Sequence, residues 1–230
     1  MQHLFPFNLA GCCLLAGLLT FVNTQAQNKA GRPVIMTLND RHVEPGVWEK
    51  VVEGSPFFNS SWRPAALLLS NGVVVEQVPV KVNLLDNQIH YLDSAGREMV
   101  TMHEVKSVIF LDEANDTSAV LVNRLALSKA AAVPDGWMQL LSKGKATLLK
   151  RMMKQDVEVK GYGASTVVTH INTTTQYLLL FDGRIEKVQT LGDIADLLES
   201  ASLSTWVAKQ RGRKQSEEQL KAAVDYFNSL

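Results

Sequence analysis

The sequence predicts an α+β fold in which an antiparallel β meander precedes two or three C-terminal α-helices. Short segments rich in β-branched and aliphatic residues alternate with turn-forming residues up to about residue 190. The apolar spacing then becomes helical after Val188, and no fixed repeat of about 20 to 50 residues is visible. We therefore expect a curved sheet, a sandwich or a small barrel over residues 34–190, with residues 191–230 packed on it as a helical segment.

Residues 1–26 have the composition of an export signal. They contain no Lys, Arg, Asp or Glu, and the stretch from Leu14 to Val22 is apolar. The small residues of Thr24-Gln25-Ala26 predict signal-peptidase cleavage between Ala26 and Gln27. The apolar stretch is shorter than the roughly 20 residues that cross a bilayer as a helix, so we expect no stable transmembrane span after cleavage.

Cys12 offers an alternative location for the protein. Leu9-Ala10-Gly11-Cys12 matches a lipobox, in which Cys12 becomes a lipidated N-terminus. The longest apolar run lies after Cys12 rather than before it, so cleavage at Ala26 is favoured. Both cysteines then leave with the signal, and the rest of the chain must fold without disulfides. We expect a periplasmic or secreted protein, with lipid anchoring through Cys12 as the alternative.

The first strands are predicted from composition and turn residues. After a polar, flexible leader at 27–33, Val34-Ile35-Met36-Thr37-Leu38 has the composition of a strand. Asn71-Gly72 separates two apolar segments and predicts a hairpin with a type I′ turn, which needs positive φ at both central residues. The valines of the second strand that share one side are expected to face the core, and they are Val74, Val78, Val80 and Val82.

Pro79 lies within this second strand. Proline cannot donate a hydrogen bond to a neighbouring strand, so we expect either a strand at the sheet edge or a bulge at Pro79. Further strands lie between turn signals such as Pro134-Asp135-Gly136 and Asp182-Gly183. They are predicted at Ile89–Leu92, Val108–Leu111, Val120–Leu125, Trp137–Ser142, Thr147–Met152 and Tyr177–Phe181.

The helices are predicted from apolar spacing and capping residues. Asp193 is the expected N-cap of the first helix, and helical spacing resumes after Ser202. A third helix is expected to begin at Ser216, where Gln219 completes a capping-box pattern. Its apolar stripe is Leu220, Ala223, Val224 and Phe227.

Charge and residue spacing exclude several functional classes. Lys and Arg total 23, as do Asp and Glu, so the chain lacks the positive charge expected of a nucleic-acid-binding protein. No P-loop, G-x-G-x-x-G or G-x-S-x-G pattern occurs, and no two histidines after the signal have the spacing of a zinc-binding helix. We therefore predict no cofactor and no metal site. Gly161-Tyr162-Gly163-Ala164-Ser165 is interpreted as a turn or bulge in preference to an anion-binding nest.

Two polar segments are interpreted as turns. Asp112-Glu113-Ala114-Asn115-Asp116 lacks the register of an EF-hand, so an acidic hairpin turn is favoured over calcium binding. Asp93-Ser94-Ala95 is similar to sites at which some Bacteroidota O-glycosylate exported proteins. Turn chemistry explains that segment without modification of Ser94.

Residues 54–64 form the most unusual local segment, with three aromatic rings, two prolines and a guanidinium. Phe57, Trp62 and Arg63 are its candidate binding residues, because aromatic rings on a loop stack on sugars or anchor a protein partner. The alternative is that Phe57 and Trp62 plug one end of the core, which the usual burial of large aromatic side chains favours.

Three stretches resemble uncharacterised exported proteins common in Bacteroidota. They are Gly54-Ser55-Pro56-Phe57-Phe58 with Trp62, Val80-Lys81-Val82-Asn83-Leu84-Leu85-Asp86-Asn87, and Asp225-Tyr226-Phe227-Asn228-Ser229-Leu230. The resemblance implies an envelope location and a β-rich domain before helices. It carries no established activity and no catalytic residues.

The expected function is that of a non-catalytic binding or scaffolding module of the cell envelope, whose partner is an envelope protein or a glycan. A secreted hydrolase is the first alternative, with His103, Glu104 and Asp112 as its site. The second alternative is a carrier of a hydrophobic ligand, whose β cavity would be lined by Val80, Val82, Ile89 and Leu121.

Overall fold

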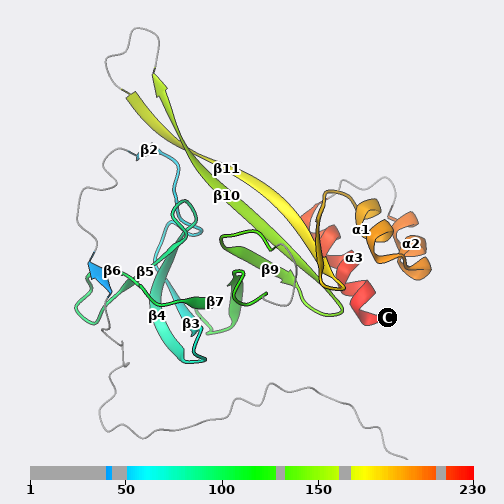
Figure 1. The fold of residues 1–230 in the computed structure, drawn as a ribbon, viewed down its shortest axis with the longest axis horizontal. Helices are drawn as coiled ribbons and strands as arrows, with labels where there is room; N and C mark the ends of the chain where they lie inside the picture. The colour runs from blue at the N-terminus through cyan, green and yellow to red at the C-terminus, as the bar shows by residue number, and fades with distance from the viewer. Residues whose placement is uncertain (1–39, 43–50, 128–132, 161–166, 211–215) are drawn as a thin grey trace, which may run out of the picture. The chain divides into compact units, whose positions relative to one another are not determined.

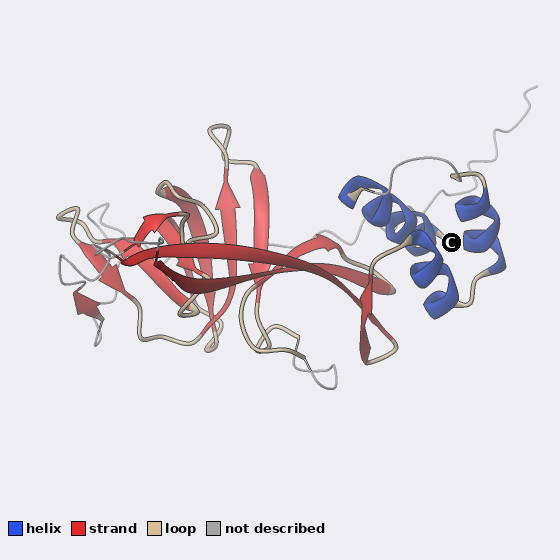
Figure 2. Cartoon of the chain, turned by 90° about the horizontal axis from the view of Figure 1, so that it is seen from above, coloured by secondary structure: helices blue, strands red, loops and turns tan. Residues whose placement is uncertain are grey.

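The computed structural model describes residues 40–42, 51–127, 133–160, 167–210 and 216–230. All of them belong to one compact unit, Pro33–Leu230. The predicted signal, leader and first strand lie outside the described residues, as does the segment Gly161–Ser165. Figure 1 traces the chain, and Figure 2 distinguishes the strands from the three helices that follow them.

The α+β class predicted from the sequence is confirmed. The described strands are, in order, β1 (Arg41–His42), β2 (Val51–Glu53), β3 (Arg63–Leu69), β4 (Val74–Asn83), β5 (Gln88–Leu92), β6 (Glu98–Val100), β7 (Val105–Leu111), β8 (Thr117–Val122), β9 (Met138–Ser142), β10 (Ala146–Lys160), β11 (Val167–Phe181) and β12 (Arg184–Val188). The helices are α1 (Leu191–Leu198), α2 (Ala201–Ala208) and α3 (Glu217–Ser229).

The strands form one open sheet in the order β1-β6-β5-β4-β3-β7-β8-β9-β10-β11-β12. Neighbours along this order are antiparallel, and β2 joins the sheet by parallel pairing with β11. Met152 of β10 packs against the same cluster as side chains of β4 and β5, although several strands separate them in the order. The sheet is therefore strongly curved, which is one of the three architectures expected.

The hairpin predicted at Asn71-Gly72 is confirmed, but its predicted turn type is wrong. β3 pairs with β4, and φ is positive at Gly72 (89°) but not at Asn71. Leu69 N–H donates to Val73 O (2.9 Å) and Gly72 N–H to Leu69 O (3.1 Å), as in a three-residue loop that ends on a left-handed glycine. Positive φ at both central residues occurs instead at Asp182 (50°) and Gly183 (71°), between β11 and β12.

β4 is an interior strand with a bulge. Its register with β3 shifts between Val75 and Val78, where Gln77 has a φ of 56°. Pro79 therefore lies neither at a sheet edge nor in the bulge itself, which is two residues earlier. The extra residue reverses which side chains face inward, so Val75 packs on the core and Val74 is 51% exposed. The prediction that Val74 faces the core is wrong for this reason.

β10 and β11 pair over 15 residues each and run side by side as a long ribbon (Figure 1). The strands predicted at Thr147–Met152 and Tyr177–Phe181 are only parts of this ribbon. From Gln155 to Val159 the side chains of β10 are exposed, so this part of the ribbon extends beyond the hydrophobic clusters.

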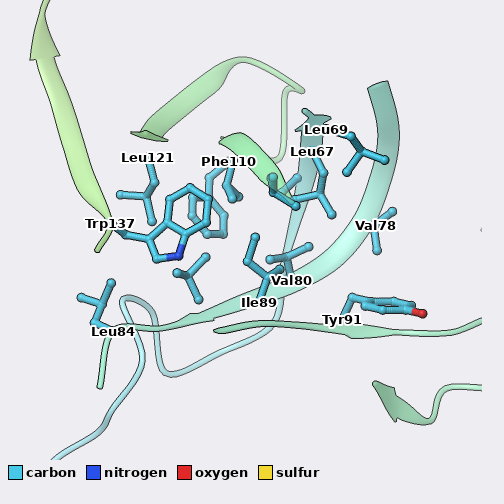
Figure 3. Packing of buried hydrophobic residues seen from close by; sticks show 14 residues of the cluster. Leu67, Leu69, Val78, Val80, Leu84, Ile89, Tyr91, Phe110, Leu121 and Trp137 are labelled. Carbon is cyan, nitrogen blue, oxygen red and sulfur yellow. The ribbon is translucent and has the colours of Figure 1, made fainter. Parts of the chain in front are cut away.

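The buried side chains of β3, β4, β5, β7 and β8 form the main hydrophobic cluster (Figure 3). Trp137, which precedes β9, lies beside Leu121 and Phe110 in this cluster and is 6% exposed. Phe58 stacks on Phe110 with 5.6 Å between the ring centroids. Phe58 and Trp137 thus fill the interior, which is the role expected of Phe57 and Trp62.

The helices share a second cluster with β10 and β11, which includes Ala146, Leu148 and Leu179. Apolar residues of α3 are buried there as predicted, at Leu220, Ala223 and Val224, with Phe227 partly buried. The fully buried Leu203 of α2 and Ile194 of α1 complete the helical side. The helical segment is therefore held on the sheet by apolar burial.

Two of the predicted helix starts need correction. The N-cap of α1 is Thr190, and Asp193 lies three residues later as the second member of a complete capping box. The N-cap of α2 is Ser200, so this helix begins before Ser202. Ser216 is the N-cap of α3 as predicted, and its side chain accepts from Gln219 N–H (3.4 Å). The Gln219 Oε1 atom is buried without a hydrogen-bond partner among the described residues, so the reciprocal half of the predicted capping box is not formed.

Candidate functional site

The segment between β2 and β3 runs antiparallel beside the end of β4 and holds the predicted aromatic residues. Phe58 N–H donates to Val82 O (2.8 Å), and Leu84 N–H donates to Pro56 O (2.8 Å). Phe57 also forms an isolated bridge with Asn83. These backbone contacts fix the path of the segment against the end of β4, so its aromatic rings are placed by the sheet.

The rings of Phe57 and Trp62 both lie close to the side chain of one lysine. The Lys81 ammonium lies 5.3 Å from the centroid of the Phe57 ring and 4.5 Å from that of the Trp62 ring. Both rings are half-buried, and Phe57 also meets the His90 ring edge-on with centroids 5.2 Å apart. A cation over an aromatic face contributes about 0.5–1 kcal/mol at exposed sites. The two rings therefore already stabilise a cation of the protein's own.

Arg63, the third predicted binding residue, is exposed at the first position of β3 and pairs in register with Val80. Within the described chain it forms no ion pair. The structure thus brings two of the three predicted residues together around Lys81, and it adds Lys81 and His90 from neighbouring strands. Sequence reasoning missed them because Lys81 faces His90 only through the β4–β5 register.

The residues considered for a hydrolase do not form one site. His103 and Glu104 precede β7, whereas Asp112 follows its last residue. A strand rises about 3.3 Å per residue, so the length of β7 keeps the two ends roughly 25 Å apart. Asp112 Oδ1 accepts from Ala114 N–H and Asp116 N–H, both at 2.9 Å, and so stabilises the turn between β7 and β8.

The residues considered for a ligand cavity pack against one another. Val80, Val82, Ile89 and Leu121 are at most 3% exposed and belong to the main cluster with Phe110 and Trp137. Their side chains pack against other protein side chains (Figure 3).

The turn that contains Ser94 is stabilised by Asp93. Asp93 Oδ1 accepts from Ala95 N–H (2.8 Å) and Arg97 N–H (2.9 Å).

A groove of about 310 Å³ lies elsewhere, where the β4–β5 turn approaches the ribbon. We call it the ribbon groove. Its lining comes from the β4–β5 turn, the segment before β9, the middle of β10 and one residue of β11. The lining residues are Leu84, Leu85, Asn87, Asp135, Gly136, Trp137, Arg151, Met152, Met153, Lys154, Gln155 and Thr174.

The turn that forms one wall of the ribbon groove is held by the buried side chain of Asn83. Asn83 Oδ1 accepts from Leu85 N–H (2.9 Å) and Asp86 N–H (3.2 Å), and its Nδ2 donates to Asp86 Oδ2 (3.0 Å). Gly136 meets this wall closely, since a Cβ there would lie 2.9 Å from Asn87 Oδ1 and its φ is 101°. Glycine is therefore required where the two walls approach.

One side of the ribbon groove is an unpaired stretch of β10. β9 pairs with β10 as far as Met138 opposite Arg151. From Met152 onward β10 pairs with β11 alone in the described part of the chain. Consecutive residues of a strand point to opposite faces, so an open edge explains why five consecutive residues from Arg151 to Gln155 all border the groove.

Two cations border the ribbon groove. Arg151 Nη2 donates to the backbone oxygen of Asp135 (3.0 Å), and Lys154 Nζ donates to Thr173 Oγ1 (2.9 Å). Burial lowers the pKa of Lys154. The Asp135 carboxylate is 86% exposed and lies 3.6 Å from Arg124 Nη1. Neither Arg151 nor Lys154 has a carboxylate within 4.0 Å among the described residues.

Sequence reasoning missed the ribbon groove as a site. It identified the turn Pro134-Asp135-Gly136 and singled out the stretch ending at Asn87, but as separate features. Their meeting depends on the curvature of the sheet, for which no local signal exists. A charged residue stands at every second position, Lys154, Asp156 and Glu158, and this pattern is the sequence signal for a solvent-facing side of β10.

The described part of the chain was compared with the requirements of a metal site and of a membrane-spanning helix. No group of three or more His, Cys, Asp or Glu side chains lies close enough there to hold a metal ion. None of the described helices combines the length and apolar character needed to cross a membrane. Comparison with protein-family models, curated proteins and solved structures found no match to this chain. The groove and its chemistry therefore carry the functional argument.

Proposed function

We propose that this protein is an exported, non-catalytic binding module of the cell envelope, and that the ribbon groove is its ligand-binding site. The single observation that carries the proposal is a groove of about 310 Å³ bordered by convergent polar groups and apolar side chains. Small-molecule sites are typically concave and occupy roughly 300–1,000 Å³, and the groove lies at the lower end of that range. The proposed partner class is a small ligand or a group displayed by a glycan or an envelope protein.

The lining supports binding in preference to turnover. Leu84, Leu85, Met152 and Met153 offer apolar contacts, and methionine side chains adapt to irregular ligand shapes. Arg151 and Lys154 are donors without acceptor capacity. The remaining charged residue of the lining is Asp135, which faces Arg124. This set orients and holds a ligand, and it has no paired nucleophile and base.

The export part of the proposal is supported by the composition of residues 1–26 and by the resemblance of three stretches to exported proteins of Bacteroidota. The test is the mass of the mature protein together with cell fractionation. We expect a chain that starts at Gln27 in the soluble envelope fraction. A lipidated N-terminus at Cys12, or retention of the signal, would contradict this part.

Binding at the ribbon groove is tested by thermal unfolding with a panel of sugars, lipids, organic acids and divalent ions. A ligand that binds only the folded state stabilises it by about 2.7 kcal/mol at a hundredfold excess over its dissociation constant. We expect at least one ligand class to raise the melting temperature of the natural protein.

A matched pair of variants locates the binding. Gln155→Trp places a large ring in the groove lining, whereas Val159→Trp places the same ring on the same face of β10, four residues further along. We expect Gln155→Trp to abolish the ligand-induced stabilisation and Val159→Trp to retain it. An equal response in both variants would show that the ligand binds elsewhere and would reject the groove as the site.

A further inference from the structure

We infer that the ribbon groove recognises the carboxylate or phosphate group of a small organic anion, held between Arg151 and Lys154. This inference rests on the proposed function and assigns a ligand class to its site. Three observations on the described residues support it, and each concerns a different property of the groove: charge, placement and apolar content.

The first observation is uncompensated positive charge. Arg151 and Lys154 donate to neutral oxygens, the backbone carbonyl of Asp135 and the hydroxyl of Thr173. A partly buried cation that lacks a counter-ion is costly, and an arriving anion relieves that cost. By contrast, two other lysines are paired with carboxylates of the helical segment, Lys150 with Glu217 at 2.7 Å and Lys221 with Asp225 at 2.6 Å.

The second observation is where the two cations lie. They are three residues apart on β10, so they leave the strand on opposite faces, Arg151 toward the segment before β9 and Lys154 toward Thr173 of β11. Their Cα atoms are roughly 10 Å apart along the strand, and both residues line the same groove, so a ligand there lies near both cations. The planar guanidinium of Arg matches the two oxygens of a carboxylate or phosphate, and the ammonium of Lys adds a point charge.

The third observation is the apolar part of the lining. Leu85, Met152 and Met153 are half-buried, and Leu84 and Trp137 are buried. An inorganic anion alone would leave these side chains uncovered. An anion that carries an apolar body would cover them, so the ligand class is organic.

The test follows the methyl signals of Met152 and Met153 by NMR at low salt, since both residues line the groove. The probes are phenyl phosphate, benzoate and neutral benzamide, which share one ring. We expect both anions to shift these two signals and to bind at least tenfold more tightly than benzamide. The signal of Met102, which is 64% exposed and outside the lining, should not move. The relative affinities of benzoate and phenyl phosphate distinguish carboxylate from phosphate recognition.

Charge variants test the roles of the two cations. Arg151→Gln and Lys154→Gln should each weaken anion binding at least fivefold, and Arg151→Lys should retain part of it. Lys187→Gln, which removes an exposed cation of β12, should leave binding unchanged. The other methionine signals report whether each variant is folded.

The outcomes separate this inference from the proposed function. Benzamide binding as tightly as the anions would reject anion recognition while leaving the groove as a ligand site. Anion binding that survives both glutamine variants would also reject it. Failure of all three probes to shift the Met152 and Met153 signals would reject the inference. The ligand panel with Gln155→Trp would still test whether the groove binds another class of ligand.

Discussion

Asn228 takes part in the hydrogen bonding of the sheet although it belongs to α3. Its Oδ1 accepts from Ala146 N–H (2.8 Å), and its Nδ2 donates to Ala146 O (2.9 Å) and Ser142 Oγ (3.3 Å). The side-chain amide thus replaces the two backbone groups that a neighbouring strand would present. The turn between β9 and β10 lets it approach because residue 144 is glycine, where a Cβ would lie 2.5 Å from the Asn228 Cγ atom.

Gly144→Ala should therefore destabilise the protein. The added methyl group displaces an amide held by three hydrogen bonds, and overpacking of this kind costs about 1–3 kcal/mol. Chemical denaturation measures the free energy of unfolding. Gly192→Ala is the matched control, because a Cβ there lies 3.4 Å from its nearest neighbour atom, Thr190 Oγ1, and alanine suits a helix. A Gly144→Ala protein as stable as Gly192→Ala would contradict this account of the turn.

At the scale of the elements, capping decides where the first helix starts. Thr190 Oγ1 accepts from Asp193 N–H (3.1 Å), and Asp193 Oδ2 accepts from Gln189 N–H (2.7 Å) and Thr190 N–H (2.9 Å). The sequence predicts Asp193 as the N-cap because Asp is common both at the N-cap and in the first turn of a helix. The reciprocal bonds identify it as the partner of the cap.

The pH dependence of stability tests the role of Asp193. Hydrogen bonds from the backbone of Gln189 and from Thr190 hold the pKa of Asp193 below its ordinary value. Because the folded-state pKa lies below the unfolded value of about 3.9, the carboxylate stabilises the fold above that pH and loses this effect as the pH falls through the folded-state pKa.

Asp193→Asn should lower the free energy of unfolding by about 1 kcal/mol at pH 7, the usual value of a helix cap. The difference from the natural protein should shrink as the pH is lowered from 5 to 3. Asp196→Asn changes an exposed residue of the same helix. It should alter neither the free energy of unfolding at pH 7 nor its dependence on pH. A difference between Asp193→Asn and the natural protein that stays constant with pH would contradict the assignment.

Local sequence patterns do not predict turn type and strand register at two hairpins of the sheet. Asn71-Gly72 and Asp182-Gly183 are equivalent turn signals, yet only the second forms the turn with two positive φ values. The bulge at Gln77 changes the register of β4 against β3, and register is a property of two strands. A single segment therefore predicts a hairpin more securely than it predicts which side chains face the core.

At the scale of the whole molecule, a polar contact joins the helical segment to the ribbon. Lys150 Nζ of β10 lies 2.7 Å from Glu217 Oε2 of α3, and the Tyr177 hydroxyl of β11 donates to the same oxygen (2.9 Å). Burial, with the hydrogen bond to Glu217, raises the pKa of Tyr177 to about 12. The start of α3 is thus fixed by a shared carboxylate in addition to apolar burial.

Glu217→Gln should lower the free energy of unfolding by about 1–2 kcal/mol, because it removes the charge from a partly buried hydrogen-bonded pair. Amide hydrogen exchange should become faster in α3 while β3, β4 and β7 keep their protection. Glu186→Gln, an exposed change on β12, is the control. Exchange that accelerates equally in α3 and in the main cluster would show that the contact does not act locally.

The sequence by itself determined the α+β class, the order of strands before helices, the hairpin at Asn71-Gly72 and the apolar stripe of α3. These features depend on neighbours within a few residues, where periodicity and turn chemistry act. The tertiary structure decided that Phe57 and Trp62 both approach Lys81, and that Asn87, Trp137 and Lys154 border one groove. Curvature and strand register bring these residues together, and both arise from contacts between segments far apart in the chain.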